Sequence, residues 1–277
     1  YGRKDYADIA FETLAFMERE MKKGKLFVAS LSAVDDRGIE GGYYLWDKDE
    51  LKALLSDAEY RAVFKAWGLD KPSPFEGGYL PIPQDEAPAS LVESAQQKLL
   101  RARQKRSLPR DEKALASWNA LALSAFRLAT RQDPAWKEKA ETLAGAILET
   151  FWDGKELWRL RKKKVAVPGT LEDYAYVLDA FSGKAFGRNV PRGTWLKEAW
   201  SRFHRKGWFL SGERLLPFAV PKPMLEDGAI PSPSAVLIRV TLETKGELRQ
   251  RAGEALKDAL PWIAAHPFSY ATAIPLL

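Results

Sequence analysis

Two kinds of helical segment alternate along this chain, and the alternation occurs three times. Segments 113–129, 173–181 and 234–242 are apolar on nearly every side, and segments 135–151, 193–205 and 247–263 each carry one apolar stripe. A helix that is apolar all round is buried, whereas a helix with one stripe lies on a surface. The apolar segments are introduced near Asp111, Leu171 and Asp227, which are 60 and 56 residues apart. This repeat predicts an all-α fold, an (α/α) toroid of helical hairpins with inner and outer layers.

The two ends of the chain fit this repeat only in part. Residues 4–23 predict a one-stripe helix with no buried partner before it, and residues 268–277 indicate the start of a buried helix. Six helix pairs would need about 350 residues at this period, so the chain has room for about four to five. We therefore expect residues 1–277 to form a single toroid domain that is incomplete and belongs to a longer chain.

Short extended segments are expected in the loops. Residues 25–30 and 42–46 flank a turn and are predicted to pair as a β-hairpin, and residues 156–161 and 208–211 have a similar pattern. Residues 72–83 are rich in proline and glycine and predict a loop. Residues 84–106 predict a polar lead-in and then a surface helix.

The chain has no cysteine and only two histidines, which excludes disulfides, thiolate zinc sites and His-rich metal sites. We expect neither a metal nor a cofactor. His204 closes a predicted surface helix, where a cation suits the helix dipole, and His266 precedes a proline in a loop. Because neither lies on an inner helix, the sequence argues against the two-histidine mechanism of sugar 2-epimerases.

Charge and hydropathy favour a cytoplasmic protein without membrane or nucleic-acid partners. The net charge is +6, but the basic residues are interleaved with acidic ones. The two basic clusters, Arg101–Arg106 and Arg161–Lys164, are interpreted as solvated faces. No apolar stretch is long enough to span a membrane, and no signal-like segment opens the chain. Binding of an anionic ligand or nucleic acid through the two clusters is a third, weaker hypothesis.

Acidic residues lie at four loop-to-helix junctions, and Asp35, Asp111, Asp173 and Asp227 are our candidate catalytic residues. The inner helices of such a ring run parallel, so the last three should gather at one mouth. Paired carboxylates suit sugar chemistry, in which one acid protonates the leaving oxygen and another acts as base or nucleophile. Any activity would therefore be of the glycoside hydrolase or sugar epimerase kind. The alternative is that each carboxylate only caps a helix.

The residues beside these junctions are candidates for binding the substrate: Glu40, Tyr44, Trp46, Lys113, Trp118, Asn119 and Tyr174. They would give the mouth an acidic and aromatic lining. A buried amide needs hydrogen-bond partners, so a structural role for Asn119 between two inner helices is equally plausible. Tyr174 is expected in the core, with its hydroxyl reaching the mouth.

From about Tyr6 to its end, the chain resembles the YyaL family, also called spermatogenesis-associated thioredoxin-like proteins. The resemblance rests on five ordered motifs: Asp35, Gly38, Glu40-Gly41, Tyr44 and Trp46; Phe75-Glu76-Gly77; Asp111, Lys113, Leu115 and Trp118-Asn119; Asp173-Tyr174-Ala175; and Asp227-Gly228-Ala229 with Pro231-Ser232. The resemblance implies a helical toroid similar to N-acylglucosamine 2-epimerases and six-hairpin glycosidases. It also implies a thioredoxin-like domain in the parent protein, which this chain lacks.

This chain departs from the family motifs at three places. Ala33 stands where the family has an aspartate, Ala120 replaces a glycine, and Pro233-Ser234-Ala235 replaces Gly-Asn-Ser. These changes remove an acid and an amide from the predicted mouth. We therefore consider two functions. The first is carbohydrate binding or processing in the mouth, and the second is a non-catalytic scaffold or interaction domain that serves a thioredoxin-like domain.

Overall fold

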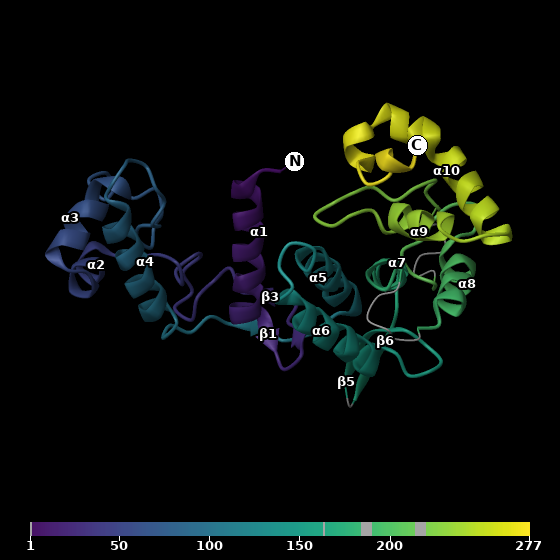
Figure 1. Ribbon diagram of the computed structural model, residues 1–277, viewed down its shortest axis with the longest axis horizontal. Helices are drawn as coiled ribbons and strands as arrows, with labels where there is room; N and C mark the ends of the chain where they lie inside the picture. The colour runs from purple at the N-terminus through teal and green to yellow at the C-terminus, as the bar shows by residue number, and fades with distance from the viewer. Residues whose placement is uncertain (1, 163, 184–189, 214–219) are drawn as a thin grey trace. The chain divides into compact units, whose positions relative to one another are not determined.

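The computed structural model describes residues 2–162, 164–183, 190–213 and 220–277, which form two compact units. The helical unit comprises Tyr1–Ala29 and Glu112–Leu277, and the inserted unit comprises Ser30–Asp111. The described residues are mostly helical, with ten α-helices and three short antiparallel strand pairs (Figure 1). Sequence analysis did not separate the inserted unit from the helical repeat. The prediction of one toroid domain over residues 1–277 stays a prediction.

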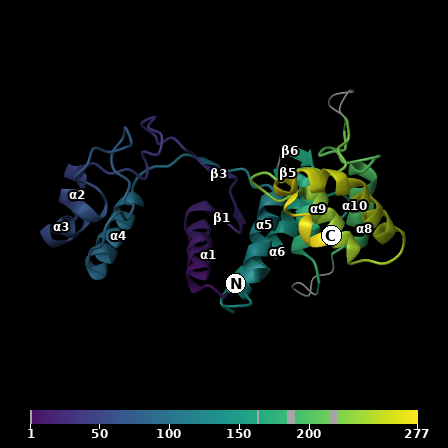
Figure 2. The same ribbon diagram turned by 90° about the horizontal axis from the view of Figure 1, so that it is seen from above.

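Three helical hairpins make up most of the helical unit. They are α5 (Ala116–Ala129) with α6 (Trp136–Phe151), α7 (Leu171–Ala180) with α8 (Arg192–Phe203), and α9 (Pro233–Leu242) with α10 (Glu247–Ala265). Helix α7 packs between α5 and α9 (Figure 1), and each of these three helices packs against the helix that follows it. Figure 2 shows α6 beside α5 and α10 beside α9. The six helices predicted from the alternating pattern are thus confirmed.

Contacts at both ends show that α5, α7 and α9 run in the same direction. At their N-terminal ends, the Ser117 amide of α5 donates to the Asp173 carboxylate of α7 at 2.9 Å. At their C-terminal ends, Arg127 of α5 donates to the Ala180 carbonyl at 2.5 Å, and Arg239 of α9 binds Asp179 at 2.8 Å. The N-terminal ends of the three inner helices therefore lie together, as the sequence predicts.

Helix α5 is less buried than its sequence suggests. Trp118 is 40 % exposed and Leu128 is 58 % exposed, although the segment is apolar on nearly every side. Helix α7 has an inner helix on both sides, whereas α5 packs against α7 on one side only among the described elements. The prediction that α5 is buried all round is therefore wrong, because no inner helix among the described residues covers its second side.

The helix predicted at the N-terminal end of the chain is present, but the helix predicted at the C-terminal end is not. Helix α1 (Lys4–Phe16) continues as a π-helical turn, Met17–Met21, which confirms the predicted helix at residues 4–23. The buried helix predicted for residues 268–277 is wrong. Those residues form two short 3₁₀ turns, Pro267–Tyr270 and Ile274–Leu276, and Phe268 is 96 % exposed. Pro267 and Pro275 lack backbone donors, which limits regular helix formation there.

The strand predictions are confirmed only in part. Strand β5 (Trp158–Lys162) pairs with β6 (Val165–Pro168), in agreement with the strand predicted at 156–161. The predicted hairpin of residues 25–30 with 42–46 is wrong. Instead, β1 (Lys22–Lys23) pairs with β2 (Leu26–Phe27), and β3 (Ser30–Leu31) pairs with β4 (Arg110–Asp111). Within 208–211, Trp208 forms isolated bridges to His204 and Lys222.

The inserted unit has its own apolar core. Its helices are α2 (Lys48–Leu54), α3 (Asp57–Ala66) and α4 (Ala89–Arg103), and only α4 was predicted from the sequence. A capping box of Ser56 and Glu59 begins α3, and this pair was a readable signal for the missed helix. Lys98 and Ser94 of α4 also bind Glu59, and together these partners lower its pKa to about 2.

Arg106 shows that the first basic cluster is more than a solvated face. Its guanidinium lies 3.9 Å from the centroid of the Trp46 ring. It donates to the Leu45 carbonyl at 2.7 Å and binds Glu50 at 2.6 Å. In the second cluster, Arg161, Lys162 and Lys164 are exposed as expected, and Lys163 lies outside the described residues. In the part of the chain that the structure describes, no helix is both long and apolar enough to cross a membrane.

Candidate functional site

The candidate site lies where the N-terminal ends of α5, α7 and α9 meet, and Asp173 is at its centre. The Asp173 side chain is wholly buried. One oxygen accepts from the Ser117 amide at 2.9 Å, and the other accepts from the Thr170 amide at 2.8 Å and from its hydroxyl at 2.9 Å. Arg159 adds a contact at 3.3 Å. Asp173 therefore caps its own helix and the neighbouring helix at once.

Asp227 is held in a similar way before α9. It accepts from the Ser232 amide at 2.6 Å and from the Thr272 amide at 2.8 Å, and it also binds the Thr272 hydroxyl. The carboxylate thus joins the start of α9 to the 3₁₀ turns near the C-terminus. Nearby, the Tyr176 hydroxyl donates to the Pro231 carbonyl, and burial raises the pKa of this tyrosine.

Asp35 and Asp111 belong to the inserted unit, whereas Asp173 and Asp227 belong to the helical unit. Asp35 closes a turn by accepting from the Ile39 amide at 3.0 Å and from Arg37, whose guanidinium lies 2.8 Å away. The bond from Ile39, followed by those from Arg37, lowers the pKa of Asp35. Asp111 lies in β4 opposite Ser30. Asp111 lies shortly before α5, which begins at Ala116.

Two of the predicted binding residues in the helical unit are structural. The Asn119 side-chain oxygen accepts from the Phe27 amide at 2.8 Å, and its nitrogen donates to the carbonyls of Phe27 at 3.1 Å and Leu115 at 2.9 Å. It ties α5 to β2, not to another inner helix. Tyr174 is wholly buried, its hydroxyl accepts from Arg202 at 3.2 Å, and burial raises its pKa. Lys113 and Trp118 are exposed.

The remaining predicted binding residues help to build the inserted unit. Trp46 is part of its core, beneath the guanidinium of Arg106. Tyr44 is half-buried, and the guanidinium of Arg103 lies 5.1 Å from its ring centroid. Glu40 is exposed, and its backbone bridges to Val34.

The polar groups that remain partly accessible near Asp173 are Arg159 and Glu172. They form an ion pair at 3.0 Å, with side chains 24 % and 17 % exposed. The sequence analysis named neither of them as a site residue. The readable signal for Arg159 was its place in the alternating strand Trp158–Lys162, just before the loop into α7. Within the described residues, no group of three His, Cys, Asp or Glu side chains is placed to hold a metal ion.

His204 differs from its predicted role as a cation at a helix end. Its ring lies between Trp200 and Trp208, with centroids 5.0 and 4.6 Å away. Burial, together with the nearby charge of Arg251, lowers the pKa of His204 to about 4. The imidazole is therefore neutral at pH 7, and the prediction of a cation is wrong. Arg251 takes that role by donating to the His204 carbonyl at 2.9 Å.

We expect this histidine to make the helical unit less stable in acid. The folded pKa of His204 is about 4 and its ordinary value is 6.5, so the unfolded chain binds the proton first as the pH falls. The free energy of unfolding should drop by up to about 3 kcal/mol between pH 6.5 and pH 4. Urea unfolding of the native chain and of His204→Gln across this range measures the effect. An equal pH slope in both proteins would contradict it.

An apolar groove lies between α1 and α5. Its volume is about 370 Å³, and it is lined by Ala7, Ala10, Phe11, Thr13, Leu14, Ala125, Leu128, Ala129 and Gln132. Tyr6 and Ile9, on the same helix as five of these residues, are also exposed. An accessible apolar surface of this kind makes the groove a candidate binding site.

Comparison with known proteins does not assign the chain to a family. A scan against protein-family models finds no match, and a search of curated proteins finds no similar sequence. The resemblance to the YyaL family therefore stays a prediction from the motifs.

Proposed function

We propose that the helical unit is a non-catalytic interaction domain that receives an amphipathic helix of a protein partner in the groove between α1 and α5. The apolar groove is the observation that carries this proposal. Its rim includes Leu128, whose side chain is largely exposed on a helix that is otherwise mostly core. Apolar grooves between helices bind amphipathic helices through side chains spaced three or four residues apart.

The inner layer of the unit supports a helix as the occupant. Helix α7 is flanked by α5 and α9, which run in the same direction and bury it almost completely. Helix α5 has the same apolar composition but an inner neighbour on one side only among the described elements. A further helix beside α5 would bury Leu128 and extend the layer. Such an extension is also how an (α/α) toroid would continue.

The predicted catalytic residues support binding more than chemistry. The carboxylates of Asp35, Asp173 and Asp227 accept hydrogen bonds from backbone amides and neighbouring side chains. A general acid or base must be able to reach the substrate and exchange a proton with it. The thioredoxin-like domain implied by the family resemblance is the first partner to test for a helix that fits the groove.

Leu128→Asp should weaken helix binding strongly without unfolding the protein. Burying a leucine contributes about 1.5–3 kcal/mol, so a charge there should weaken the complex at least tenfold. Helical peptides selected from a displayed library on the immobilised chain provide the probe. We expect the selected peptides to carry apolar residues at positions i, i+3 or i+4, and i+7.

The matched control is Leu260→Asp, which charges another exposed leucine, on α10. The selected peptides should bind this variant as they bind the native chain. Peptides without the apolar spacing, or equal binding to Leu128→Asp, would contradict the proposal. The same pair of variants then tests a purified thioredoxin-like domain of the parent protein.

Carbohydrate binding at the mouth is a second candidate, favoured by the exposure of Trp118. This residue follows Ser117, whose amide binds Asp173, and Glu172 precedes that aspartate. The first turns of α5 and α7 therefore carry Trp118 and Glu172, and Arg159 of β5 forms an ion pair with Glu172. An aromatic face with charged hydrogen-bonding groups suits a sugar ring. The mouth would bind a sugar without cleaving it, since the Asp173 carboxylate already accepts hydrogen bonds from Ser117 and Thr170.

If the mouth binds sugars, Trp118→Ala should remove the effect of any sugar on thermal stability. A ligand at a hundredfold excess over its Kd stabilises the folded state by about 2.7 kcal/mol. Mono- and disaccharides at millimolar concentrations are screened by thermal shift. Trp262→Ala is the control, because this tryptophan is also exposed but lies on α10. No shift with any sugar, or an equal shift in Trp118→Ala, would remove this candidate.

A further inference from the structure

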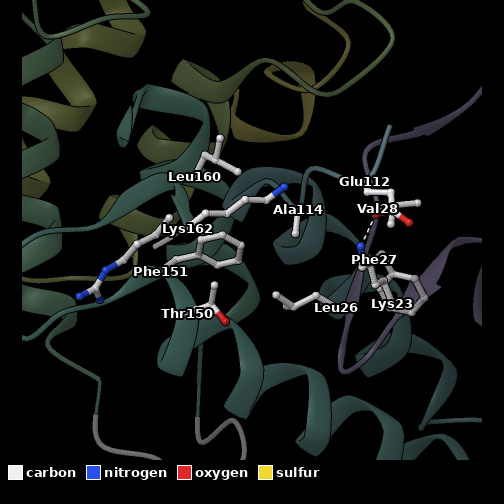
Figure 3. Close-up of a pocket in the computed structure, with 11 residues that line it drawn as sticks. Lys23, Leu26, Phe27, Val28, Glu112, Ala114, Thr150, Phe151, Leu160 and Lys162 are labelled. Carbon is white, nitrogen blue, oxygen red and sulfur yellow. Dashed lines mark hydrogen bonds and ion pairs between the residues drawn. The ribbon is translucent and has the colours of Figure 1, made fainter. Parts of the chain in front are cut away.

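We infer that a second pocket of the helical unit binds a small monocarboxylate with an apolar body, such as an aromatic or short aliphatic acid. The pocket has a volume of about 250 Å³. It lies between β1 and β2, the segment before α5, the C-terminal end of α6, and β5 (Figure 3). None of its residues lines the groove between α1 and α5.

The interior of the pocket is apolar. Phe151 is wholly buried and Phe27 nearly so, and their rings contribute to the walls together with Leu26 and Leu160 (Figure 3). Ala114 leaves space where a larger side chain would fill the cavity. A wall of aromatic and aliphatic groups is the usual lining of a small-molecule site.

The polar residues that line the pocket are Lys23, Glu112, Thr150, Arg161 and Lys162. Lys162 shares a face of β5 with Leu160, because alternate residues of a strand point the same way. Its chain extends across the pocket with the ammonium group toward Ala114 (Figure 3). Lys23 pairs with Glu112, whereas Lys162 has no ion pair with any described residue. Arg161, the neighbour of Lys162 in β5, also lines the pocket, so cations beside an apolar interior favour a ligand with an apolar body and a negative charge.

The C-terminal end of α6 offers Lys162 another role. This helix ends at Phe151, and its last carbonyls carry partial negative charge that attracts a cation. In that case Lys162 would stabilise the helix without binding any ligand. The test must therefore separate ligand binding from helix capping.

Titration of the complete chain with sodium benzoate, and with benzamide as its neutral analogue, tests the inference. Isothermal calorimetry should show saturable binding of benzoate and at least tenfold weaker binding of benzamide. Lys162→Met should remove this preference, and Lys162→Arg should retain it. Ala114→Leu should abolish binding of both compounds by filling the cavity.

Lys164→Met is the matched control, because Lys164 is an exposed lysine of the same hairpin that does not line the pocket. It should bind benzoate as the native chain does. Equal binding of benzoate and benzamide would overturn the inference, as would benzoate binding that survives Lys162→Met or Ala114→Leu. Absence of saturable benzoate binding, with a lower melting temperature for Lys162→Met, would assign this lysine to helix capping.

Discussion

Asp173→Ala is expected to lower the free energy of unfolding of the helical unit by about 3–5 kcal/mol. The carboxylate is wholly buried and binds the amides of Ser117 and Thr170. Alanine would leave both donors without this partner, and Arg159 would keep only Glu172 among its two carboxylates. The loss should also separate the N-terminal ends of α5 and α7, since their closest polar link would be gone.

Thermal unfolding followed by circular dichroism measures this effect. For a unit of this size, each kcal/mol corresponds to about 2–4 °C in melting temperature, so a fall of about 10 °C is expected. Asp173→Asn should cost less, because the amide oxygen still accepts one backbone bond. Glu172→Gln is the control, since it alters the partly exposed partner of the same arginine. A loss below about 1 kcal/mol for Asp173→Ala would return this residue to the list of catalytic candidates.

Asn119→Ala is expected to cost about 2–3 kcal/mol and to release β2 from α5. The amide of Asn119 binds both the N–H and the carbonyl of Phe27, and both groups lose this partner once the side chain is removed. Phe27 also packs edge-on against Phe126 of α5, with ring centroids 5.6 Å apart. Loss of the amide therefore weakens the attachment of the β1–β2 pair to the helical core.

Hydrogen exchange of residues 22–28 gives the specific readout for this variant. The Phe27 amide should lose protection in Asn119→Ala, while amides in the middle of α9 keep theirs. Asn119→Asp tests the donor separately, because a carboxylate can still accept from the Phe27 amide but cannot donate to its carbonyl. Unchanged protection of Phe27 in Asn119→Ala would show that apolar packing alone holds the strand.

The inserted unit shows why part of the fold was not predictable from periodicity. Helix α2 spans only Lys48–Leu54, and too few turns are present for a clear apolar stripe. Helix α3 (Asp57–Ala66) does carry a stripe, at Tyr60, Val63 and Phe64, which was a readable signal that sequence analysis missed. Their caps were readable, but a cap alone does not show which residues a helix packs against. Trp46 and Tyr44 were therefore assigned to a substrate mouth, although they contact the arginines of the inserted unit.

The spacing of apolar residues was enough to predict the six helices of the three hairpins, and the repeat predicted the common direction of the inner ones. The spacing of apolar residues along a helix indicates whether one side or several sides of it are buried. Tertiary structure decided the roles of the polar residues. Asp173 meets Ser117 across 56 residues of sequence, and Asn119 meets Phe27 across 92. Such bonds follow no period, because a buried polar group needs only one partner, and that partner can come from any segment that the fold brings beside it.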